Sequence, residues 1–238
     1  MYRIDKILAH MGYGTRSEIK KLLKQGRLKI NGQTEKDPSK KIDTTKAEIV
    51  FDGEKVIYKE FIYLMLNKPQ GIISATEDKR ERTVIDIIDS KYTNFELFPI
   101  GRLDKDTEGL LILTNDGKLA HELLSPKKHV PKTYFVKVEG LLTDNELVSF
   151  QEGIVLDDGY KTLPASLIIL EQGELSTAEV ILQEGKYHQI KRMFAALGKQ
   201  VVYLKRTRMG ELPLDEGLSL GQCRELTSGE LQLLKPGN

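Results

Sequence analysis

The sequence predicts an α+β protein of two domains, a small one at the N-terminus followed by a larger one. Three observations support this prediction. Apolar residues at helical spacing open the chain and are followed by a hairpin signal, all within the first 55 residues. Many short β-type runs and a few helices come next, without the strict strand–helix alternation of a parallel sheet. The length of 238 residues suits one large domain or two modest ones.

The first 55 residues carry the signals of two helices and a hairpin. Apolar side chains spaced i, i+3, i+4 and i+7 over residues 4–11 predict a first helix, which two glycines then break. Thr15 and Glu18 have the spacing of a capping box and start a second helix. Gly26 ends that helix, and residues 27–30 alternate as a strand before an Asn-Gly turn. These signals predict a small, self-contained module.

A polar stretch at residues 56–60 predicts a linker, and residues 61–238 are expected to form the larger domain. Continuous apolar runs at 61–66 and 109–114 predict interior strands. Further strands are expected at 133–138, 163–170, 178–182 and 201–204, and helices at 119–124, from Thr143, and at 188–197. Together these elements predict a mostly antiparallel mixed sheet with flanking helices.

The composition argues against several classes of protein. Hydrophobic residues make up 39% and charged residues 30%, as expected for a chain with an ordinary core. The apolar runs fall far short of the roughly 20 residues of a membrane span, and the N-terminus shows no signal-peptide pattern. The single cysteine, Cys223, cannot form an internal disulfide and leaves no cysteine cluster for zinc. We therefore expect a cytoplasmic protein.

The net charge of +1 conceals a segregated distribution of charge. Residues 1–30 carry eight basic and two acidic side chains, and residues 186–208 carry seven basic and no acidic ones. The other 185 residues carry 21 basic and 33 acidic side chains. Two basic segments on an otherwise acidic chain indicate a polyanion bound at two places, and nucleic acid is the obvious candidate. The alternative is that both segments are well-hydrated helix faces.

Six basic side chains of the first module avoid its apolar positions: Arg3, Lys6, Arg16, Lys20, Lys24 and Arg27. Arg16, Lys20 and Lys24 are four residues apart, so they share one helix face that can follow a phosphate backbone. No aromatic residue is interleaved among them, which favours contacts to phosphate and shape over base stacking. The module resembles the RNA-binding domain of the S-four ribosomal-protein type. The matching segments are Arg3-Ile4-Asp5-Lys6, Thr15-Arg16-Ser17 and residues 26–32.

The most informative stretch is GRLDKDTEGLLILTNDG at residues 101–117. It places one arginine and three carboxylates, those of Asp104, Asp106 and Glu108, directly before a buried strand. Loops held by a rigid scaffold often carry reactive groups. Charged residues before an apolar strand are also typical of a plain solvated loop, so the residues alone leave both interpretations open.

This stretch closely resembles the catalytic motif of the pseudouridine synthases, in the ribosomal RNA branch typified by the bacterial RsuA enzymes. Further segments resemble that family in order: residues 67–71 (NKPQG), Ser125-Pro126 with Lys132-Thr133-Tyr134, residues 184–198, and residues 221–227. The resemblance covers essentially the whole chain. It implies an RNA-binding domain at residues 1–55 and a synthase domain at residues 61–238.

The resemblance also implies roles for individual residues. Asp104 would be the carboxylate that acts at the anomeric carbon of a flipped-out uridine, and Lys191 the cation that keeps it ionised. Tyr134 would stack on the uracil. The further RNA-binding candidates are Arg102, His188, Gln189 and Arg192. The isomerisation adds and removes no atoms, so neither a cofactor nor a metal is expected, and the sequence has no P-loop, dinucleotide-binding glycine motif or Cys/His ligand cluster.

The favoured substrate is a uridine of 16S small-subunit rRNA, or of a small-subunit assembly intermediate. Three alternatives stay open: a synthase acting on 23S rRNA, a non-catalytic rRNA-binding or ribosome-assembly factor, and a glycosidase using Asp104 with Glu108. The intact trio of Asp104, Tyr134 and Lys191 argues against a silent factor, and a glycosidase leaves the basic N-terminal module unexplained. The chain shows no heptad pattern or apolar surface stripe, which favours a monomer.

Overall fold

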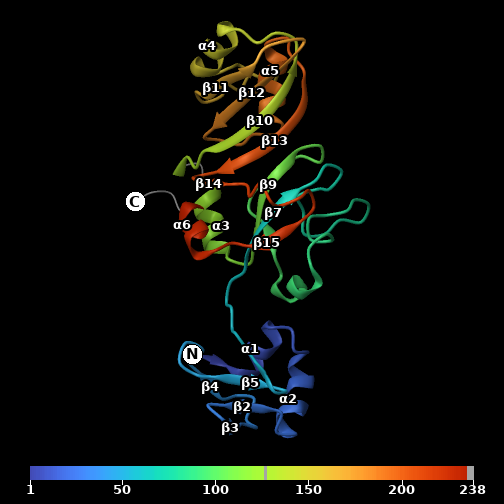
Figure 1. Ribbon diagram of the computed structural model, residues 1–238, viewed down its shortest axis with the longest axis vertical. Coiled ribbons are helices and arrows are strands. Elements are labelled where there is room, and N and C mark those ends of the chain that lie inside the picture. Colours follow the sequence, from blue (N-terminus) through green and yellow to red (C-terminus); the bar gives the residue numbers. More distant parts are fainter. Residues whose placement is uncertain (126–127, 235–238) are drawn as a thin grey trace. The chain divides into compact units, whose positions relative to one another are not determined.

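The computed structural model describes residues 1–125 and 128–234, and the chain divides into two compact units (Figure 1). Unit 1 comprises Met1–Ile62 together with Asp89–Glu96. Unit 2 comprises Tyr63–Ile88 and the chain from Leu97 onward. None of the helices in these described ranges is long and apolar enough to cross a membrane.

Unit 1 contains two short helices and two small sheets. Its elements are β1 (Tyr2–Arg3), α1 (Ile4–His10), α2 (Arg16–Lys24), β2 (Leu28–Ile30), β3 (Gln33–Thr34), β4 (Lys41–Ile42), β5 (Ile49–Phe51), β6 (Glu54–Lys55) and the 3-10 helix η1 (Ser90–Phe95). β1 pairs with β4, and the second sheet has the order β3-β2-β5-β6. The apolar faces of α1 and α2 pack on β2 and β5 through side chains that include Ile7, Leu23 and Phe51.

The local signals of unit 1 lie where the sequence predicts them. The unit itself extends beyond the predicted residues 1–55. At the start of α2 the Glu18 amide donates to Thr15 Oγ1 at 3.3 Å and the Thr15 amide to Glu18 Oε2 at 2.8 Å, which confirms the capping box. Val56, in the segment expected to be a linker, is 5% exposed and belongs to the core. Residues 89–96 join the unit because the His10 ring meets the edge of Phe95, with 5.0 Å between ring centroids.

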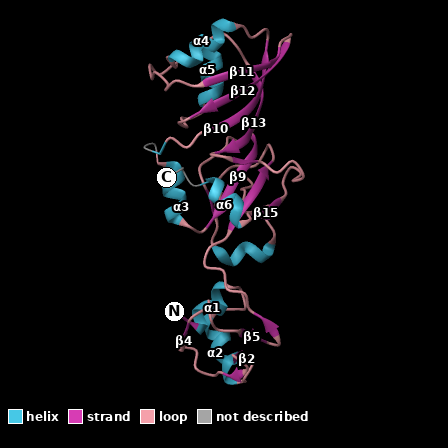
Figure 2. Ribbon diagram, turned by 60° about the vertical axis from the view of Figure 1, so that its left-hand side comes forward, coloured by secondary structure: helices cyan, strands magenta, loops and turns pink. Residues whose placement is uncertain are grey.

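Unit 2 is built on one large sheet with helices packed against it (Figures 1 and 2). Its strands are β7 (Tyr63–Lys68), β8 (Phe98–Pro99), β9 (Glu108–Thr114), β10 (Lys132–Glu139), β11 (Ser166–Glu171), β12 (Leu175–Leu182), β13 (Val201–Met209), β14 (Leu212–Pro213) and β15 (Cys223–Glu225). Its helices are α3 (Gly117–Leu124), α4 (Asp144–Glu152), α5 (Gln189–Ala196) and α6 (Ser228–Leu234). The sheet follows the order β11-β12-β10-β13-β9-β7-β15, with β14 beside β13 and β8 beside β9.

The sheet has two halves, each with its own core. The half around β10 and β12 packs against α4 and α5, where Phe150 and Phe194 lie 5.0 Å apart by ring centroids. The half around β7 and β9 packs against α3 and α6 through residues such as Ile112 and Leu123. Figures 1 and 2 show the two helix pairs beside their own halves. The halves join where β9 pairs with β13, the one parallel pair among the described strands, so the predicted mostly antiparallel mixed sheet is confirmed.

The seam between the two halves depends on a glycine. Gly109 is opposite Arg206 across the parallel pair, with φ +102, and a Cβ added there would lie 2.2 Å from the Arg206 carbonyl oxygen. No side chain fits without moving the backbone of β13. Glycine is therefore required both for its conformation and for the close approach of the two chains.

Gly109→Ala is expected to lower the free energy of unfolding by at least about 3 kcal/mol, since it combines a backbone clash with an unfavourable φ. Urea unfolding followed by circular dichroism measures the loss. Gly117→Ala is the matched control, because a Cβ at this first residue of α3 meets nothing within 4 Å. The control should be neutral or slightly stabilising. Equal stabilities for the two variants would contradict the close approach.

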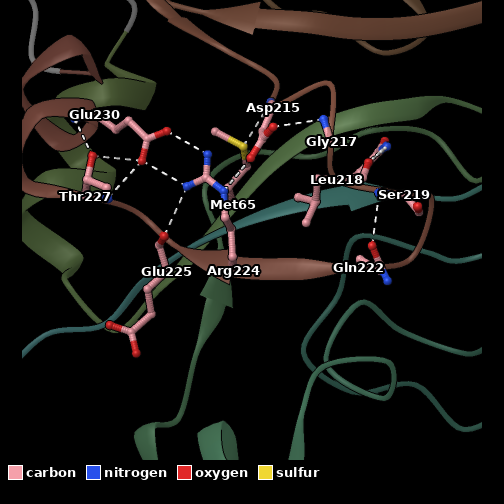
Figure 3. Close-up of polar contacts among 11 residues, drawn as sticks. Met65, Asp215, Gly217, Leu218, Ser219, Gln222, Arg224, Glu225, Thr227 and Glu230 are labelled. Atoms are coloured by element: carbon pink, nitrogen blue, oxygen red, sulfur yellow. Dashed lines mark hydrogen bonds and ion pairs between the residues drawn. The ribbon is translucent and has the colours of Figure 1, made fainter.

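The C-terminal segment is fastened to the sheet by a cluster around Arg224 (Figure 3). Arg224 donates from Nε to Asp215 Oδ2 at 2.7 Å, and from Nη1 and Nη2 to the two carboxylate oxygens of Glu230 at 2.9 and 2.7 Å. Glu230 also accepts from the amide and hydroxyl of Thr227 at the start of α6. β15 and α6 are thereby held together beside β7.

Glu230→Gln is expected to cost about 1–3 kcal/mol of folding stability at neutral pH, because it breaks a two-pronged pair with Arg224. The hydrogen bonds from Arg224 lower the pKa of Glu230 to about 2, from an ordinary value of 4.5. The contribution is therefore complete above about pH 4.5 and disappears as the pH falls toward 2. Unfolding of both proteins over this pH range should show the two stabilities converging at acid pH. A constant difference at every pH would contradict the pairing, and Glu152→Gln, at the exposed end of α4, serves as the neutral control.

Candidate active site

The loop before β9 is anchored from beneath by Lys68, the last residue of β7. Its side chain is 0% exposed, and Nζ donates to the carbonyl oxygens of Pro69, Asp104 and Thr107 at 3.0, 3.0 and 2.9 Å. Burial lowers the pKa of this ammonium to about 8, against the opposing effect of Asp104 and its neighbouring carboxylates. The buried lysine therefore fixes the backbone on both sides of Asp104.

Further contacts fix the same loop. Ser74 exchanges hydrogen bonds with Leu103, its Oγ donating to the carbonyl oxygen at 2.9 Å and accepting from the amide at 3.0 Å. The Gly71 amide donates to the Lys105 carbonyl oxygen at 2.8 Å. Sequence reasoning assigned no role to Lys68 or Ser74. The available signal for Lys68 was a lysine that directly continues an apolar strand.

Asp104 lies within reach of two basic side chains. Lys191 Nζ is 3.3 Å from Asp104 Oδ2, and His188 Nε2 is 3.6 Å from Asp104 Oδ1. Lys191 also contacts a second carboxylate, with Nζ 2.5 Å from Asp106 Oδ1. The family resemblance predicts that Asp104 and Lys191 form a pair. In the structure the same ammonium lies nearer to a second carboxylate, that of Asp106.

The charges around Asp104 are unequally exposed. The side chains of Lys191 and Asp104 are 23% and 28% exposed, whereas that of Asp106 is 68% exposed. Burial on its own would raise the pKa of Asp106, but the hydrogen bond and charge of Lys191 hold that pKa below its ordinary value. Lys191 therefore stabilises the negative charge of Asp106 at the mouth of the site.

The position of Lys191 depends on how α5 begins. His188, the residue before α5, adopts a left-handed conformation with φ 49. Gln189 is 4% exposed and donates from Nε2 to Glu184 Oε1 at 2.7 Å, while its Oε1 accepts from the Lys186 amide at 2.9 Å. These contacts close the turn between β12 and α5. They favour a role for Gln189 in holding this turn over direct contact with RNA.

A groove opens over Asp104 at the seam of the sheet. It holds about 460 Å³ of space, part of it open to solvent, which leaves room for a nucleobase. The polar and aromatic side chains that line it are Arg102, Asp104, Thr107, Tyr134, Lys186, His188 and Gln189. Tyr134 is half-buried on β10, and Thr107 Oγ1 is buried without a hydrogen-bond partner in the described part of the chain. The groove thus combines an acidic group, basic groups, an aromatic ring and an unused hydroxyl.

One predicted RNA-binding residue of α5 is occupied by partners within the chain. Arg192 Nε donates to Asp157 Oδ1 at 2.6 Å, and Nη2 lies 2.7 Å from Asp158 Oδ2. The hydrogen bonds that Arg192 donates to Asp158 and Asp157 raise its pKa further. Arg192 therefore ties α5 to the turn at residues 157–159, and sequence reasoning missed this because the partners are far away in the chain.

The six basic candidates of unit 1 are all exposed. Two of them have acidic partners: Arg3 donates to both carboxylate oxygens of the buried Asp5 at 3.0 and 2.9 Å, and Arg27 pairs with Asp52. Arg3 therefore helps hold the start of α1. Arg16, Lys20 and Lys24 lie along α2, as their spacing predicts.

Pro126, in the expected Ser125-Pro126 segment, lies outside the described residues. Within residues 1–125 and 128–234, no group of three or more His, Cys, Asp or Glu side chains could hold a metal ion.

Comparison with known proteins shows the family to which the chain belongs. Residues 62–196 match the family described as RNA pseudouridylate synthase, and residues 3–49 match the S4 domain. The chain is 50% identical over 233 residues to an uncharacterized RNA pseudouridine synthase, YtzG, of Bacillus subtilis, with 98% of each chain covered. It is 40% identical to the ribosomal small subunit pseudouridine synthase A of Haemophilus influenzae, covering 98% of this chain and 99% of the relative.

Two further relatives extend the comparison. The ribosomal large subunit pseudouridine synthase B of Bacillus subtilis is 39% identical, with 99% of this chain and 96% of the relative covered. A crystal structure described as a pseudouridylate synthase superposes with a TM-score of 0.69 at 39% identity, covering 98% of this chain and 100% of that one. The family match spans more than half of the chain, and several relatives match it over nearly all of its length. The chain belongs to the RNA pseudouridine synthase family and carries an S4 domain at its N-terminus.

Proposed function

We propose that this enzyme isomerises one specific uridine of 16S ribosomal RNA to pseudouridine, with Asp104 as the catalytic carboxylate. The observation that carries the proposal is the groove itself, which has room for a base and is lined by Asp104, whose Oδ2 lies 3.3 Å from Lys191 Nζ. The rRNA substrate is supported by relatives named for the small and the large ribosomal subunit.

The reaction explains why an ionised carboxylate is needed there. The bond between the ribose and the uracil nitrogen breaks, the uracil turns over, and a ring carbon bonds to the ribose in its place. That carbon then loses its proton, and the released nitrogen gains one. A carboxylate can attack the anomeric carbon, stabilise its developing positive charge, or remove a neighbouring sugar proton. In each case Asp104 has to act as a carboxylate, and the Lys191 ammonium lies 3.3 Å from its Oδ2.

The other groove residues have roles that follow from the same step. The target nucleotide has to leave its stack, at a cost of a few kcal/mol. Tyr134 stacks on the extruded uracil, a contact worth about 1–3 kcal/mol. Arg102 fills the space left in the RNA, and His188 borders the ribose beside Asp104. The basic face of α2 holds a distant part of the RNA by its phosphates.

The choice of the small subunit rests on the motifs NKPQG, GRLDKDTEGL and EGKYHQIKRMFAA, which resemble the RsuA branch most. The small-subunit and large-subunit relatives, at 40% and 39% identity, do not separate the two substrates. A 23S target is therefore the second candidate.

Chemical mapping of pseudouridine on both ribosomal RNAs, from cells with and without the gene, tests the proposal. We expect one 16S position to revert to uridine in the deletion strain and to be restored by the wild-type gene but not by Asp104→Asn. Loss of a 23S position instead would move the substrate to the large subunit. Unchanged maps of both RNAs would contradict the proposed function.

A further inference from the structure

A second cavity adjoins the active-site groove. It holds about 680 Å³ of space, part of it open to solvent, and Gly185 and Lys186 line both this cavity and the groove. Its basic side chains are His129, Lys132 and Lys186. The two spaces therefore lie on either side of a shared wall.

The charge of this second cavity lacks an anionic partner. Lys132 is half-buried, and its side chain makes no hydrogen bond or ion pair with any residue in the described part of the chain. Burial, and after it the positive charge of Arg206, lowers the pKa of Lys132 to about 8. An ammonium taken out of water without a partner destabilises the fold. A contribution to folding stability therefore does not explain why a lysine occupies position 132.

A second cation, Arg206, acts electrostatically on Lys132. Arg206 is 3% exposed; its Nε donates to the Leu110 carbonyl oxygen at 2.7 Å, and its Nη2 is buried with no hydrogen-bond partner among the residues that the structure describes. Arg206 is opposite Tyr134 across β10 and β13, and Lys132 is two residues before Tyr134 on the same strand. Since alternate residues of a strand face the same side, all three lie on the face that bears the groove.

The acidic residue of the cavity does not neutralise these cations. Glu184 also lines it, but its carboxylate already accepts from the Tyr160 hydroxyl at 2.7 Å, the Leu163 amide at 2.9 Å and Gln189 Nε2 at 2.7 Å. Lys186 Nζ is 4.6 Å from the centre of the Tyr160 ring, on the same wall. The cavity therefore offers a half-buried positive site with its only described acid engaged elsewhere.

We propose that this cavity binds a phosphodiester group of the RNA, next to the nucleotide whose base occupies the groove, with Lys132 as the main contact. The inference rests on the proposed function and adds to it a place where the backbone beside the target is held. Phosphate contacts fix the register of a nucleic acid on a protein without reading its sequence. Gripping the backbone on the far side of Lys186 would hold the extruded uridine in place over Asp104.

The test compares Lys132→Met with Lys137→Met, a lysine on the same strand but on its opposite face. Binding of total ribosomal RNA from cells lacking the gene is measured by filter retention over a range of KCl concentrations. We expect Lys132→Met to bind roughly tenfold more weakly. Its plot of log affinity against log salt should be shallower by about 0.7–0.9, the contribution of one phosphate. Lys137→Met should keep the wild-type slope.

A structural role for Lys132 is excluded by measuring stability on the same proteins. The midpoint of thermal unfolding of Lys132→Met should equal or exceed that of the wild type, because the substitution removes an unpaired buried charge. A lower midpoint together with weaker binding would overturn the proposal, and so would an unchanged slope. Because binding needs no turnover, an enzyme that forms no pseudouridine would contradict the proposed function without altering this comparison.

A second arm separates RNA from free phosphate as the ligand. Unfolding midpoints are compared in sodium phosphate and in sodium chloride at equal ionic strength. Inorganic phosphate should raise the midpoint of the wild type more than that of Lys132→Met, and equal effects on both would count against an anion site. A phosphate effect combined with an unchanged RNA slope would mean that the cavity takes a free anion, and the RNA proposal would be wrong.

Discussion

Asp104→Asn is expected to lower the rate of pseudouridine formation by on the order of 10⁴-fold or more while leaving RNA affinity near the wild-type value. The amide keeps the shape of the side chain but cannot act as a nucleophile or base or carry the negative charge that the reaction needs. Lys191 keeps its nearer contact to Asp106, at 2.5 Å, so the groove should stay formed. Release of tritium from rRNA labelled at C5 of uridine measures the rate, and filter retention measures affinity.

The matched control for this variant is Asp144→Asn, an identical chemical change at the exposed start of α4. It should retain full activity. Substantial turnover by Asp104→Asn would remove Asp104 from the mechanism. A parallel collapse of RNA affinity would mean that Asp104 holds the groove together and does not act on the sugar.

Lys68→Met is expected to be the most destabilising single change at the site, lowering the free energy of unfolding by about 3–5 kcal/mol. Methionine fills a similar volume but leaves the carbonyl oxygens of Pro69, Asp104 and Thr107 buried without their donor. Activity should fall with stability, because the same three contacts fix the backbone of the catalytic loop. Urea unfolding and the tritium assay measure the two losses.

Lys105→Met is the control for Lys68→Met, because it is a lysine of the same loop with a different environment. Lys105 is 51% exposed and pairs with Glu81 at the surface, where an ion pair contributes at most about 1 kcal/mol. Its loss should change stability little. Similar stabilities for the two variants would show that the buried ammonium is not what anchors the loop.

Much of the local structure was predictable because its signals are short-range. The spacing of Thr15 and Glu18 predicts a helix start that depends on four consecutive residues, and the structure forms it. The same holds for Thr143 and Glu146 at the start of α4. The helix expected at residues 188–197 is α5, Gln189–Ala196, because its apolar face is periodic over two turns.

The arrangements that sequence could not predict all depend on contacts between distant residues. The parallel pairing of Gly109 with Arg206 joins strands separated by most of unit 2. In the sequence, Arg192 has no acidic residue near it and is expected to be a free cation. In the folded chain, the turn at residues 157–159 supplies its acidic partners. In the sequence, Lys68 is an ordinary lysine at the end of an apolar strand. The carbonyl groups that it binds come close to it only when the loop before β9 folds. The residues of the site were named through family motifs, since charge patterning alone indicated no more than a polyanion.

The groove draws its walls from both halves of the sheet, with Asp104 and Thr107 before β9 and Tyr134 and Gln189 on β10 and α5. Neither half on its own carries a complete set of reacting groups. A partly melted molecule, with one half intact, would consequently be inert even though it retained most of its secondary structure. The thermal tolerance of the enzyme is therefore set by whichever half melts first, and heat inactivation should precede the main loss of ellipticity.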